Sequence, residues 1–509
     1  MTFDLAPHRL PGVIEPDGPE VSCDLAILGS GMGGATLAYA LRSSGARILV
    51  VERGDFLPRE HQNWSPEAVF VQGRYRNGDQ WHDAQGQPFH PGVHYYVGGN
   101  TKVYGATLPR FREIDFGPVA HAEGDSPAWP IGYADLEPHY GRAEELYRVH
   151  GTRGEDPTDP WRSTDYPHPA VEHEGAVADL ADRLRGQGLR PFHLPTGIDL
   201  REGGDCVRCG TCDSFPCLVG AKSDADVRAL RPALATGDVR LLTRTLVGRL
   251  HTDAGGRRVT HAVATRDGKT VTIRAERFVV ACGAVNTAAL LLRSGIANGS
   301  GRVGRNYMVH NSTFLVAADP ARRNQAVFQK TLGLNDWYLA KGRRAPLGNV
   351  QMLGKLQEPM VRAARPNVPA SVRRFVTRRS VDLYLTSEDL PTRDNRVALD
   401  AAGRITVHWK PNNLRAHAEL VRRTTRSLRA AGYPLVMTRR MGIETNSHQC
   451  GTAVMGTDGA TSVVDPAGRT HEHDNLFVAD SSVFCSSAAV NPALTVAANA
   501  FRIAGGVLA

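Results

Sequence analysis

The chain has 509 residues, enough for two domains or for one large interrupted domain. Hydrophobic residues make up 41% and charged residues 22%, as in ordinary soluble proteins, and no apolar run approaches the roughly 18 residues that a membrane span needs. The opening residues lack a basic segment followed by an apolar one, so we expect a cytoplasmic protein with no secretory signal and no membrane contact.

The formal net charge is +8, and the densest basic stretch spans residues 361–380. Such a stretch could bind an anionic partner such as nucleic acid. No nucleic-acid-binding module accompanies it, and the other arginines are scattered along the chain. We therefore interpret it as a solvated basic face and expect no nucleic-acid partner.

The first recognisable elements form a strand–helix–strand unit. Residues 24–28 predict a short buried strand, 35–46 a helix, and 47–52 a second strand that ends at Glu52. Between strand and helix lies GSGMGG, residues 29–34, with the spacing G-x-G-x-x-G. This turn lets the backbone approach a pyrophosphate at a helix N-terminus, and an acid about 20 positions on accepts from ribose hydroxyls. The unit predicts a dinucleotide site, and its early position mildly favours FAD over NAD.

Four cysteines crowd together with the spacing C-x2-C-x2-C-x4-C. A bacterial ferredoxin run has a last gap one residue shorter, with proline after it, and four thiolates could also hold zinc. Structural thiols or a local disulfide, a metal site and redox chemistry all stay open. We favour structural thiols or a local disulfide, and we expect no metal at this site. The four are Cys206, Cys209, Cys212 and Cys217.

Residues 277–295 predict another strand, a glycine turn at Gly283 and a helix. Two alternating strands around a turn at Gly403 are predicted within residues 395–409.

The C-terminal part carries a single histidine, His448, in SHQCGTAVMG. Alone it could be a catalyst, a metal ligand or a packed core residue. Further on, a strand is predicted at 475–479 with Asp480 at its end. A helix should then open at Pro492, with Asn491 suited to its N-cap.

In this order, the motifs resemble the glucose–methanol–choline (GMC) family of flavin oxidoreductases over nearly the whole chain. The resemblance rests on the glycine turn, on GGNT at 98–101, on VVACGAVNTAALLLRSG, on SHQCGTAVMG, and on NLFVADSSVF through NPALTVAANAFRIA. It implies an α/β (α+β) fold of the p-hydroxybenzoate-hydroxylase type, in which a Rossmann-like FAD-binding domain is interleaved with a substrate domain built on an antiparallel sheet. Within the family, the chain looks most similar to pyranose oxidases and bacterial glycoside 3-oxidases, including those of C-glycosides.

The family pattern implies a division into two discontinuous domains. The FAD-binding domain should collect residues 1–110, 200–310 and 440–509. The substrate domain should collect residues 111–199 and 311–439, including the hairpin predicted around Gly403.

The resemblance also assigns the cofactor site. The ADP part of FAD should lie against the glycine turn and the acid after the second strand, GGNT should follow the pyrophosphate and flavin, and Asp480 should mark a strand end near the cofactor. The last helix should point its N-terminus at the flavin pyrimidine. The expected cofactor-binding residues are Gly29, Ser30, Gly31, Gly34, Glu52, Gly98, Gly99, Asn100, Thr101, Val103, Asp480 and Asn491.

Fungal pyranose oxidases attach FAD covalently through a histidine in the segment that corresponds to GGNTKVYGATLPR. Aligning the glycines and the terminal Pro109-Arg110 puts Val103 at that position, and the segment contains no histidine. We therefore predict that FAD is bound without a covalent link.

The pair at the flavin face should be His448 and Asn491, which is the pyranose-oxidase arrangement. A neutral histidine can take the hydroxyl proton, because its pKa is near neutral, while flavin N5 takes the hydride. Asn491 cannot titrate but can orient the hydroxyl. We expect an oxidase that converts a ring secondary hydroxyl, at C3 or C2 of a sugar or glycoside, into a ketone, with O2 reduced to H2O2.

Three rival functions stay open. The first is a sugar dehydrogenase with a quinone or protein acceptor, in which the cysteines would form an iron–sulfur relay; related GMC sequences with similar cysteine stretches have no known need for a metal. The second is a lyase on the same fold, and the third is a flavin-binding module without turnover. The exact sugar and the oligomeric state also stay open. Residues 324–344 are a candidate substrate loop, in which Trp337 and Tyr338 could stack on a sugar or simply pack against a sheet edge.

Overall fold

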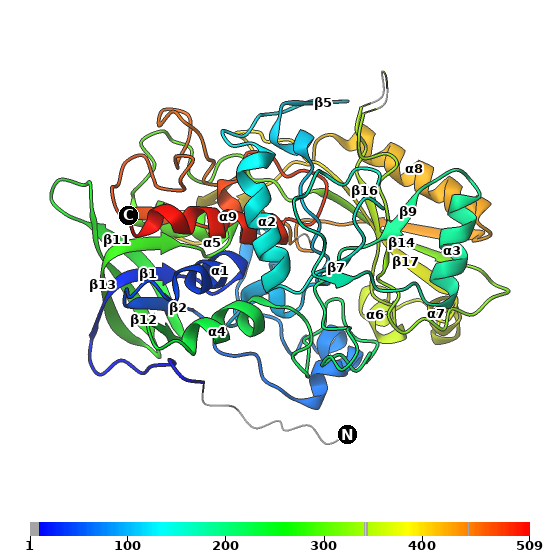
Figure 1. Ribbon diagram of the computed structural model, residues 1–509, viewed down its shortest axis with the longest axis horizontal. Coiled ribbons are helices and arrows are strands. Elements are labelled where there is room, and N and C mark those ends of the chain that lie inside the picture. Colours follow the sequence, from blue (N-terminus) through cyan, green and yellow to red (C-terminus); the bar gives the residue numbers. More distant parts are fainter. Residues whose placement is uncertain (1–9, 341, 343–344, 446) are drawn as a thin grey trace.

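The computed structural model describes residues 10–340, 342, 345–445 and 447–509. Two large sheets lie towards opposite ends of its long axis, with helix α2 standing between them (Figure 1). Within the described residues, no helix is both long and apolar enough to cross a membrane.

The first sheet has the order β10–β2–β1–β13–β12–β11, with β21 also paired to β13. Its central pairs are parallel, whereas β11, β12 and β13 form an antiparallel meander. The apolar runs of the central strands suit this position, because parallel strands are covered on both faces. The strands are β1 (Glu20–Leu28), β2 (Ile48–Val51), β10 (Val239–Leu242), β11 (Thr245–Thr252), β12 (Val259–Arg266), β13 (Lys269–Val280) and β21 (Leu476–Val478).

Helices cover this sheet and bring the C-terminus back to the glycine turn. Helix α9 packs against both α1 and α2, so the last helix lies beside the first (Figure 1). The Tyr140 hydroxyl of α2 meets Thr495 Oγ1 of α9 at 2.7 Å, which fixes that contact. The helices are α1 (Met32–Leu41), α2 (Tyr133–Leu146), α4 (Arg231–Leu234), α5 (Ala284–Ser294) and α9 (Ala493–Val507).

The second sheet has the order β20–β14–β17–β16–β15–β9, and all its neighbouring strands are antiparallel. Helices α3 (Gly175–Arg185) and α8 (Leu414–Ala430) place Leu180 and Leu420 in a second core with Leu383 of this sheet. The expected fold class, a Rossmann-like sheet with an antiparallel substrate-domain sheet, is confirmed. The strands are β9 (Pro191–His193), β14 (Asn311–Ala318), β15 (Leu332–Leu334), β16 (Asn349–Met352), β17 (Ser380–Ser387) and β20 (Leu435–Arg440).

The hairpin expected around Gly403 forms, with that glycine at φ +75°, but in another sheet. Its strands β18 (Arg396–Leu399) and β19 (Ile405–His408) join β3 (Trp81–Asp83) and β4 (Pro88–Phe89) in a separate four-stranded sheet. The hairpin is therefore not part of the six-stranded substrate-domain sheet.

Helix α2 departs in a similar way from the predicted domain division. It was expected in the substrate domain, yet Tyr133 and Tyr140 belong to the same core as α1 and α9. The aromatic side chains of α2 pack on the side of α9, the last helix. The division into two interleaved domains, with the boundaries given above, stays a proposal.

The basic stretch 361–380 forms ion pairs with nearby carboxylates. Arg362 pairs with Glu67 and Arg373 pairs with Glu358, in keeping with a solvated face.

Short elements connect the layers of the fold. These elements are η1 (His61–Trp64), η2 (Glu67–Val71), η3 (Gly99–Lys102), η4 (Glu113–Phe116), β5 (Val119–His121), β6 (Gly124–Ser126), β7 (His150–Gly151), β8 (His168–Pro169), η5 (Asp226–Leu230), α6 (Glu358–Ala364), α7 (Ala370–Thr377) and η6 (Ser481–Val483).

Candidate active site

The glycine turn between β1 and α1 is built from two kinds of glycine. A Cβ at Gly29 would lie 2.3 Å from the Ala281 carbonyl oxygen, and one at Gly34 would lie 2.0 Å from the Gly29 oxygen. The fold itself therefore requires these two glycines. A Cβ at Gly31 would meet no protein atom within 4 Å. The second glycine of the motif thus faces open space, which fits the approach of a pyrophosphate.

Glu52 joins this turn to the neighbouring loop. Its Oε2 accepts from the Ser30 N–H at 3.1 Å and from the Ser30 Oγ at 2.7 Å, and its Oε1 accepts from the Gly54 N–H at 3.0 Å. The Ser30 Oγ in turn accepts from the Gly98 N–H at 3.1 Å. Since a carboxylate has about four acceptor positions, Glu52 can still accept from a ribose hydroxyl.

The GGNT stretch lies directly on the glycine turn. Gly98 and Gly99 have φ of +95° and +57°, and a Cβ at Gly99 would lie 3.3 Å from the Gly31 Cα. Asn100 Oδ1 accepts from the backbone of residue 94, and Val103 ends the η3 turn. The stretch thus shares one surface with the open side of Gly31, and these residues fit a dinucleotide such as FAD.

A buried ammonium holds this stretch in place. Lys102 Nζ donates to Asp224 Oδ2 at 3.0 Å and to Asp226 Oδ2 at 2.9 Å, and all three side chains are nearly buried. Thr101 Oγ1 also accepts from the Ala225 N–H at 3.0 Å. Burial would lower the pKa of Lys102, but its two carboxylate partners raise it above the ordinary value, so the ammonium stays charged.

Asp480 follows β21 and ties that strand end to the turn before α5. Its carboxylate accepts from the Gly283 N–H at 2.8 Å, from the Thr287 Oγ1 at 2.5 Å and from the Ser482 N–H at 2.8 Å. Burial raises the pKa of Asp480. The side chain holds two strand ends together at the edge where the glycine turn lies, and its contact with FAD remains a prediction.

His448 lies beside a second histidine that the sequence interpretation did not single out. Its Nδ1 is 3.2 Å from His310 Nδ1, and His310 Nε2 is 2.8 Å from the Ser487 carbonyl oxygen. Tyr384 presents its ring edge-on, with centroids 6.0 Å apart. Burial, followed by the charges of His310 and Lys330, holds the pKa of His448 well below its usual range. His448 is therefore a neutral imidazole at ordinary pH.

The two contacts of His310 specify a tautomer. A carbonyl oxygen can only accept, so His310 Nε2 carries hydrogen and donates to Ser487. When His310 is neutral, its Nδ1 is an acceptor, and the His448 Nδ1 opposite must be the donor. His448 Nε2 is then left with a lone pair, the form that a general base requires.

Asn491 meets the same face of the substrate-domain sheet as His448. Its Oδ1 accepts from Gln351 Nε2 at 2.8 Å. Gln351 pairs directly with Tyr384 across β16 and β17, and opposite residues of an antiparallel pair point to the same face. The histidine beside Tyr384 and the asparagine bonded to Gln351 thus lie against the same face of the sheet, next to neighbouring strand residues.

One local expectation about Asn491 is wrong. The last helix begins at Ala493 with Pro492 at its cap, and no side chain caps it. Asn491 is instead drawn to Gln351, which leaves its amide N–H groups available as donors among the described contacts.

The position of Tyr338 speaks against a stacking role. Its side chain is 4% exposed, its hydroxyl donates to Asp115 at 2.9 Å and accepts from the Ala489 N–H, and Arg112 lies over its ring. Trp337 is half-buried against the second core, so its proposed sugar contact stays a prediction. Residues 341, 343 and 344 of the candidate substrate loop lie outside the described residues.

The four crowded cysteines are free thiols. Burial raises the pKa of Cys212 to about 12 and also raises that of Cys206. In the described part of the chain, no group of three or more His, Cys, Asp or Glu side chains is arranged to hold a metal ion. Structural thiols remain our interpretation of Cys206, Cys209, Cys212 and Cys217.

The chain is similar to known protein families and to individual proteins. Residues 194–312 and 391–500 match two parts of the GMC oxidoreductase family, and residues 27–58 match an NAD(P)-binding Rossmann-like domain. The 6'''-hydroxyparomomycin C oxidase of Streptomyces lividus is 31% identical over 96% of this chain and 92% of its own length. The chain belongs to the GMC oxidoreductase family. It is an enzyme that acts on CH–OH donors.

Other relatives show the range of this family. The paromamine 6'-oxidase of Streptomyces fradiae is 29% identical over 95% of this chain and 91% of its own length. The fructose dehydrogenase large subunit of Gluconobacter japonicus is 26% identical over 96% and 98%. The crystal structure of a pyridoxine 4-oxidase shares the fold, with a TM-score of 0.67 at 20% identity over 95% of this chain and 98% of its own. The expected likeness to pyranose oxidases in particular is not shown by these relatives.

The glycine turn gives a matched pair of variants. Gly31→Ala should fold, because its Cβ meets no protein atom, but should lose FAD, because the methyl group fills the space left for the pyrophosphate. Gly34→Ala should fail earlier, because its Cβ would overlap the Gly29 carbonyl. Thermal unfolding measures the stability of each variant, and flavin absorbance measures its bound FAD. Full FAD content in Gly31→Ala would show that the pyrophosphate does not lie against Gly31.

The buried lysine of η3 gives a stability prediction. Lys102→Met leaves Asp224 and Asp226 buried without their shared cation, which should cost about 3–5 kcal/mol. Arg231, which also donates to Asp226, compensates only one of the carboxylates. Denaturant unfolding of the FAD-loaded protein measures the loss, and an unchanged midpoint would show that Lys102 does not hold the GGNT stretch.

Proposed function

We propose that the chain is an FAD-dependent oxidase that converts a ring secondary hydroxyl of a sugar or glycoside, at C3 or C2, into a ketone. A single observation carries the proposal: His448 lies beside Tyr384, and Asn491 is bonded to Gln351, the residue that pairs directly with Tyr384 in the substrate-domain sheet. One of these side chains can accept a proton, and the other can only form hydrogen bonds. That combination suits removal of a proton from an alcohol held in one orientation.

His448 performs the proton transfer. Its Nδ1–H is held by His310, so the lone pair on Nε2 accepts the hydroxyl proton of the substrate. Because burial and nearby positive charge keep the pKa of this histidine low, it is ready as a base before the substrate arrives. His310 positions the imidazole through its own bond to Ser487.

Asn491 orients the alcohol. Its Oδ1 is occupied by Gln351, so its N–H groups can donate to the same hydroxyl oxygen that gives its proton to His448. Two contacts to one oxygen fix which C–H bond faces the cofactor. FAD, bound without a covalent link, would supply the acceptor for the hydride of that C–H bond, with O2 as the final oxidant that becomes H2O2.

The relatives favour a second candidate. Two of them are named for paromamine and 6'''-hydroxyparomomycin C, and the former acts at a 6' position. This chain could therefore oxidise a 6'-hydroxyl of an amine-bearing sugar to an aldehyde. The similarity over nearly the full length of both chains supports it, whereas Asn491 beside His448 supports the ring hydroxyl.

Anaerobic flavin reduction tests the proposal. The purified FAD-loaded protein is mixed with free sugars, O-glycosides, C-glycosides and paromamine, and air is then admitted while peroxide is assayed. Reduction by neutral glycosides, followed by prompt peroxide formation, supports the proposal. Reduction by paromamine alone supports the second candidate, and reduction without reoxidation indicates a dehydrogenase. Flavin that no compound reduces would overturn it in favour of a lyase or a binding module.

His448→Ala should slow anaerobic flavin reduction by about 10²–10⁴-fold while FAD stays bound, because it removes the general base. His417→Gln is the matched control. His417 is also buried, and burial lowers its pKa to about 4, but it is bonded to Thr313 and Ser387 away from the pair. The control should lower the melting temperature and leave the rate per bound flavin nearly unchanged. Equal rates in His448→Ala and the wild type would remove His448 from the mechanism.

The pH profile tests the histidine pair. Reduction needs neutral His448, so its rate should fall only at pH values below the usual histidine pKa of about 6.5. His310 is neutral when it accepts from His448, but in acid its positive charge lowers the pKa of His448, and Asn cannot carry that charge. The acid limb of His310→Asn should therefore move to higher pH. Asn tolerates the φ of +66° at this position and can still accept from His448, so the alkaline plateau should be largely kept. If the acid limb of the pH profile does not move, the interaction between His310 and His448 is contradicted.

A further inference from the structure

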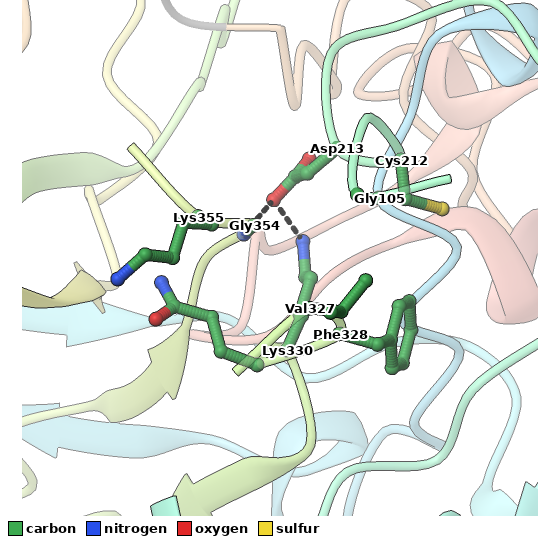
Figure 2. A pocket seen from close by; sticks show the side chains of 10 residues that line it. Gly105, Cys212, Asp213, Val327, Phe328, Lys330, Gly354 and Lys355 are labelled. Atoms are coloured by element: carbon green, nitrogen blue, oxygen red, sulfur yellow. Dashed lines mark hydrogen bonds and ion pairs between the residues drawn. The ribbon is translucent and has the colours of Figure 1, made fainter. Parts of the chain in front are cut away.

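A hollow opens where four segments meet (Figure 2). Gly105 follows the GGNT stretch of the cofactor side, Asp213 comes from the cysteine-rich segment, and Lys330 and Gly354 belong to the substrate side. The cysteine-rich segment, which the proposed chemistry does not use, therefore forms one wall of a cavity between the cofactor site and the substrate sheet.

This hollow lies close to the catalytic pair. Gln351 of β16 donates to Asn491, and three residues later the same chain reaches the hollow at Gly354. At about 3.3 Å per extended residue, the two positions are at most about 10 Å apart along the strand. Lys330 lies just ahead of β15, which pairs with β16, and its charge acts on His448. The hollow has a free volume of about 10 Å³, room for one water-sized group, so one hydroxyl of a sugar held at the pair fits there.

An ion pair stands at the centre of the hollow, as the dashed lines of Figure 2 show. Asp213 Oδ2 accepts from Lys330 Nζ at 2.7 Å and from the Gly354 N–H at 3.2 Å. The two side chains are only 12% and 7% exposed. They are nearly buried yet border a cavity.

Two glycines make room for the pair. A Cβ at Gly105 would lie 1.9 Å from Lys330 Nζ and 2.6 Å from Asp213 Oδ1, and a Cβ at Gly354 would lie 2.7 Å from the Asp213 Cβ. Neither glycine needs a left-handed backbone, because neither has a positive φ. Their absent side chains are explained by the space that Lys330 and Asp213 occupy.

The pair has hydrogen-bonding capacity beyond its internal contact. An ammonium has three donors, and Lys330 uses one of them on Asp213 in the contacts of the described residues. Asp213 Oδ1 is a further acceptor, since Oδ2 takes both donors. A donor and an acceptor side by side match a single sugar hydroxyl, which both donates and accepts.

We propose that the Lys330–Asp213 pair is a recognition subsite for one uncharged sugar hydroxyl remote from the reacting carbon. This inference rests on the proposed function and names its substrate class as neutral polyols. The pair is already neutralised internally and is nearly buried, so an ammonium brought beside it would lose its water without gaining a free countercharge. Neutral hydroxyls carry a much smaller desolvation cost.

Binding is measured without turnover, in the FAD-loaded His448→Ala protein, from sugar-induced changes in flavin absorbance. The ligands are methyl β-D-glucopyranoside, its monodeoxy analogues and its 2-amino-2-deoxy analogue. We expect one deoxy position to bind about 10–100-fold more weakly, because it leaves the ion pair without its partner hydroxyl. The amine analogue should bind no better than the neutral sugar.

The expected discrimination against that deoxy sugar disappears in Lys330→Met and in Asp213→Asn, each added to His448→Ala. Lys355→Met is the matched control: Lys355 also borders the hollow, but its ammonium is directed to the Ser380 carbonyl at 3.4 Å, so discrimination should survive. FAD content and melting temperature report on folding. Because Asp213→Asn keeps the shape of the side chain, it tests the subsite even where Lys330→Met fails to fold.

Discrimination that survives both changes would overturn the subsite, and so would tighter binding of the amine analogue. Absence of any sugar-induced change in every protein would overturn it as well. If neutral sugars bind with the expected discrimination but never reduce the wild-type flavin, the proposed oxidation fails while the subsite stands.

Discussion

The site depends on one loop that joins the two sides of the molecule. Residues 487–491 accept hydrogen bonds from three side chains of the substrate-domain sheet or its start, which are His310, Thr386 and Gln351. The same loop runs directly into α9, which packs against α1 behind the glycine turn. The backbone that leads into α9 is therefore bonded to the sheet against which the histidine and the asparagine lie. Burial at this junction keeps His448 neutral, and the junction positions Asn491.

Much of this architecture follows from local sequence. The strand–helix–strand unit around residues 29–34 and the hairpin around Gly403 are short-range patterns, in which neighbouring residues fix the turn. Their boundaries shifted by a few residues: α1 begins at Met32, inside the glycine turn, because Gly33 and Gly34 can form its first turn. The family resemblance supplied His448, whose neighbours at Cys450 and Gly451 carry the motif.

The remaining features are contacts between residues far apart in the chain, which no local pattern specifies. His310 is 138 positions from His448 and belongs to no motif, and its left-handed backbone gives no signal in the sequence. The partnership of Lys330 with Asp213 spans 117 positions and becomes visible only when Gly105 is seen to leave room for it. The placement of α2 likewise depended on a tertiary partner, since its aromatic face would have suited either core.

The most direct test of the central claim is the position of the C–H bond that breaks. Anaerobic flavin reduction is timed with a neutral glycoside deuterated at C2, at C3 or at C6. The account predicts that deuterium at C2 or C3 slows the reduction, because His448 and Asn491 present a ring hydroxyl to the cofactor. Slowing by deuterium at C6 alone would contradict it and would assign aldehyde formation to this enzyme, as the name of the paromamine 6'-oxidase suggests for that relative.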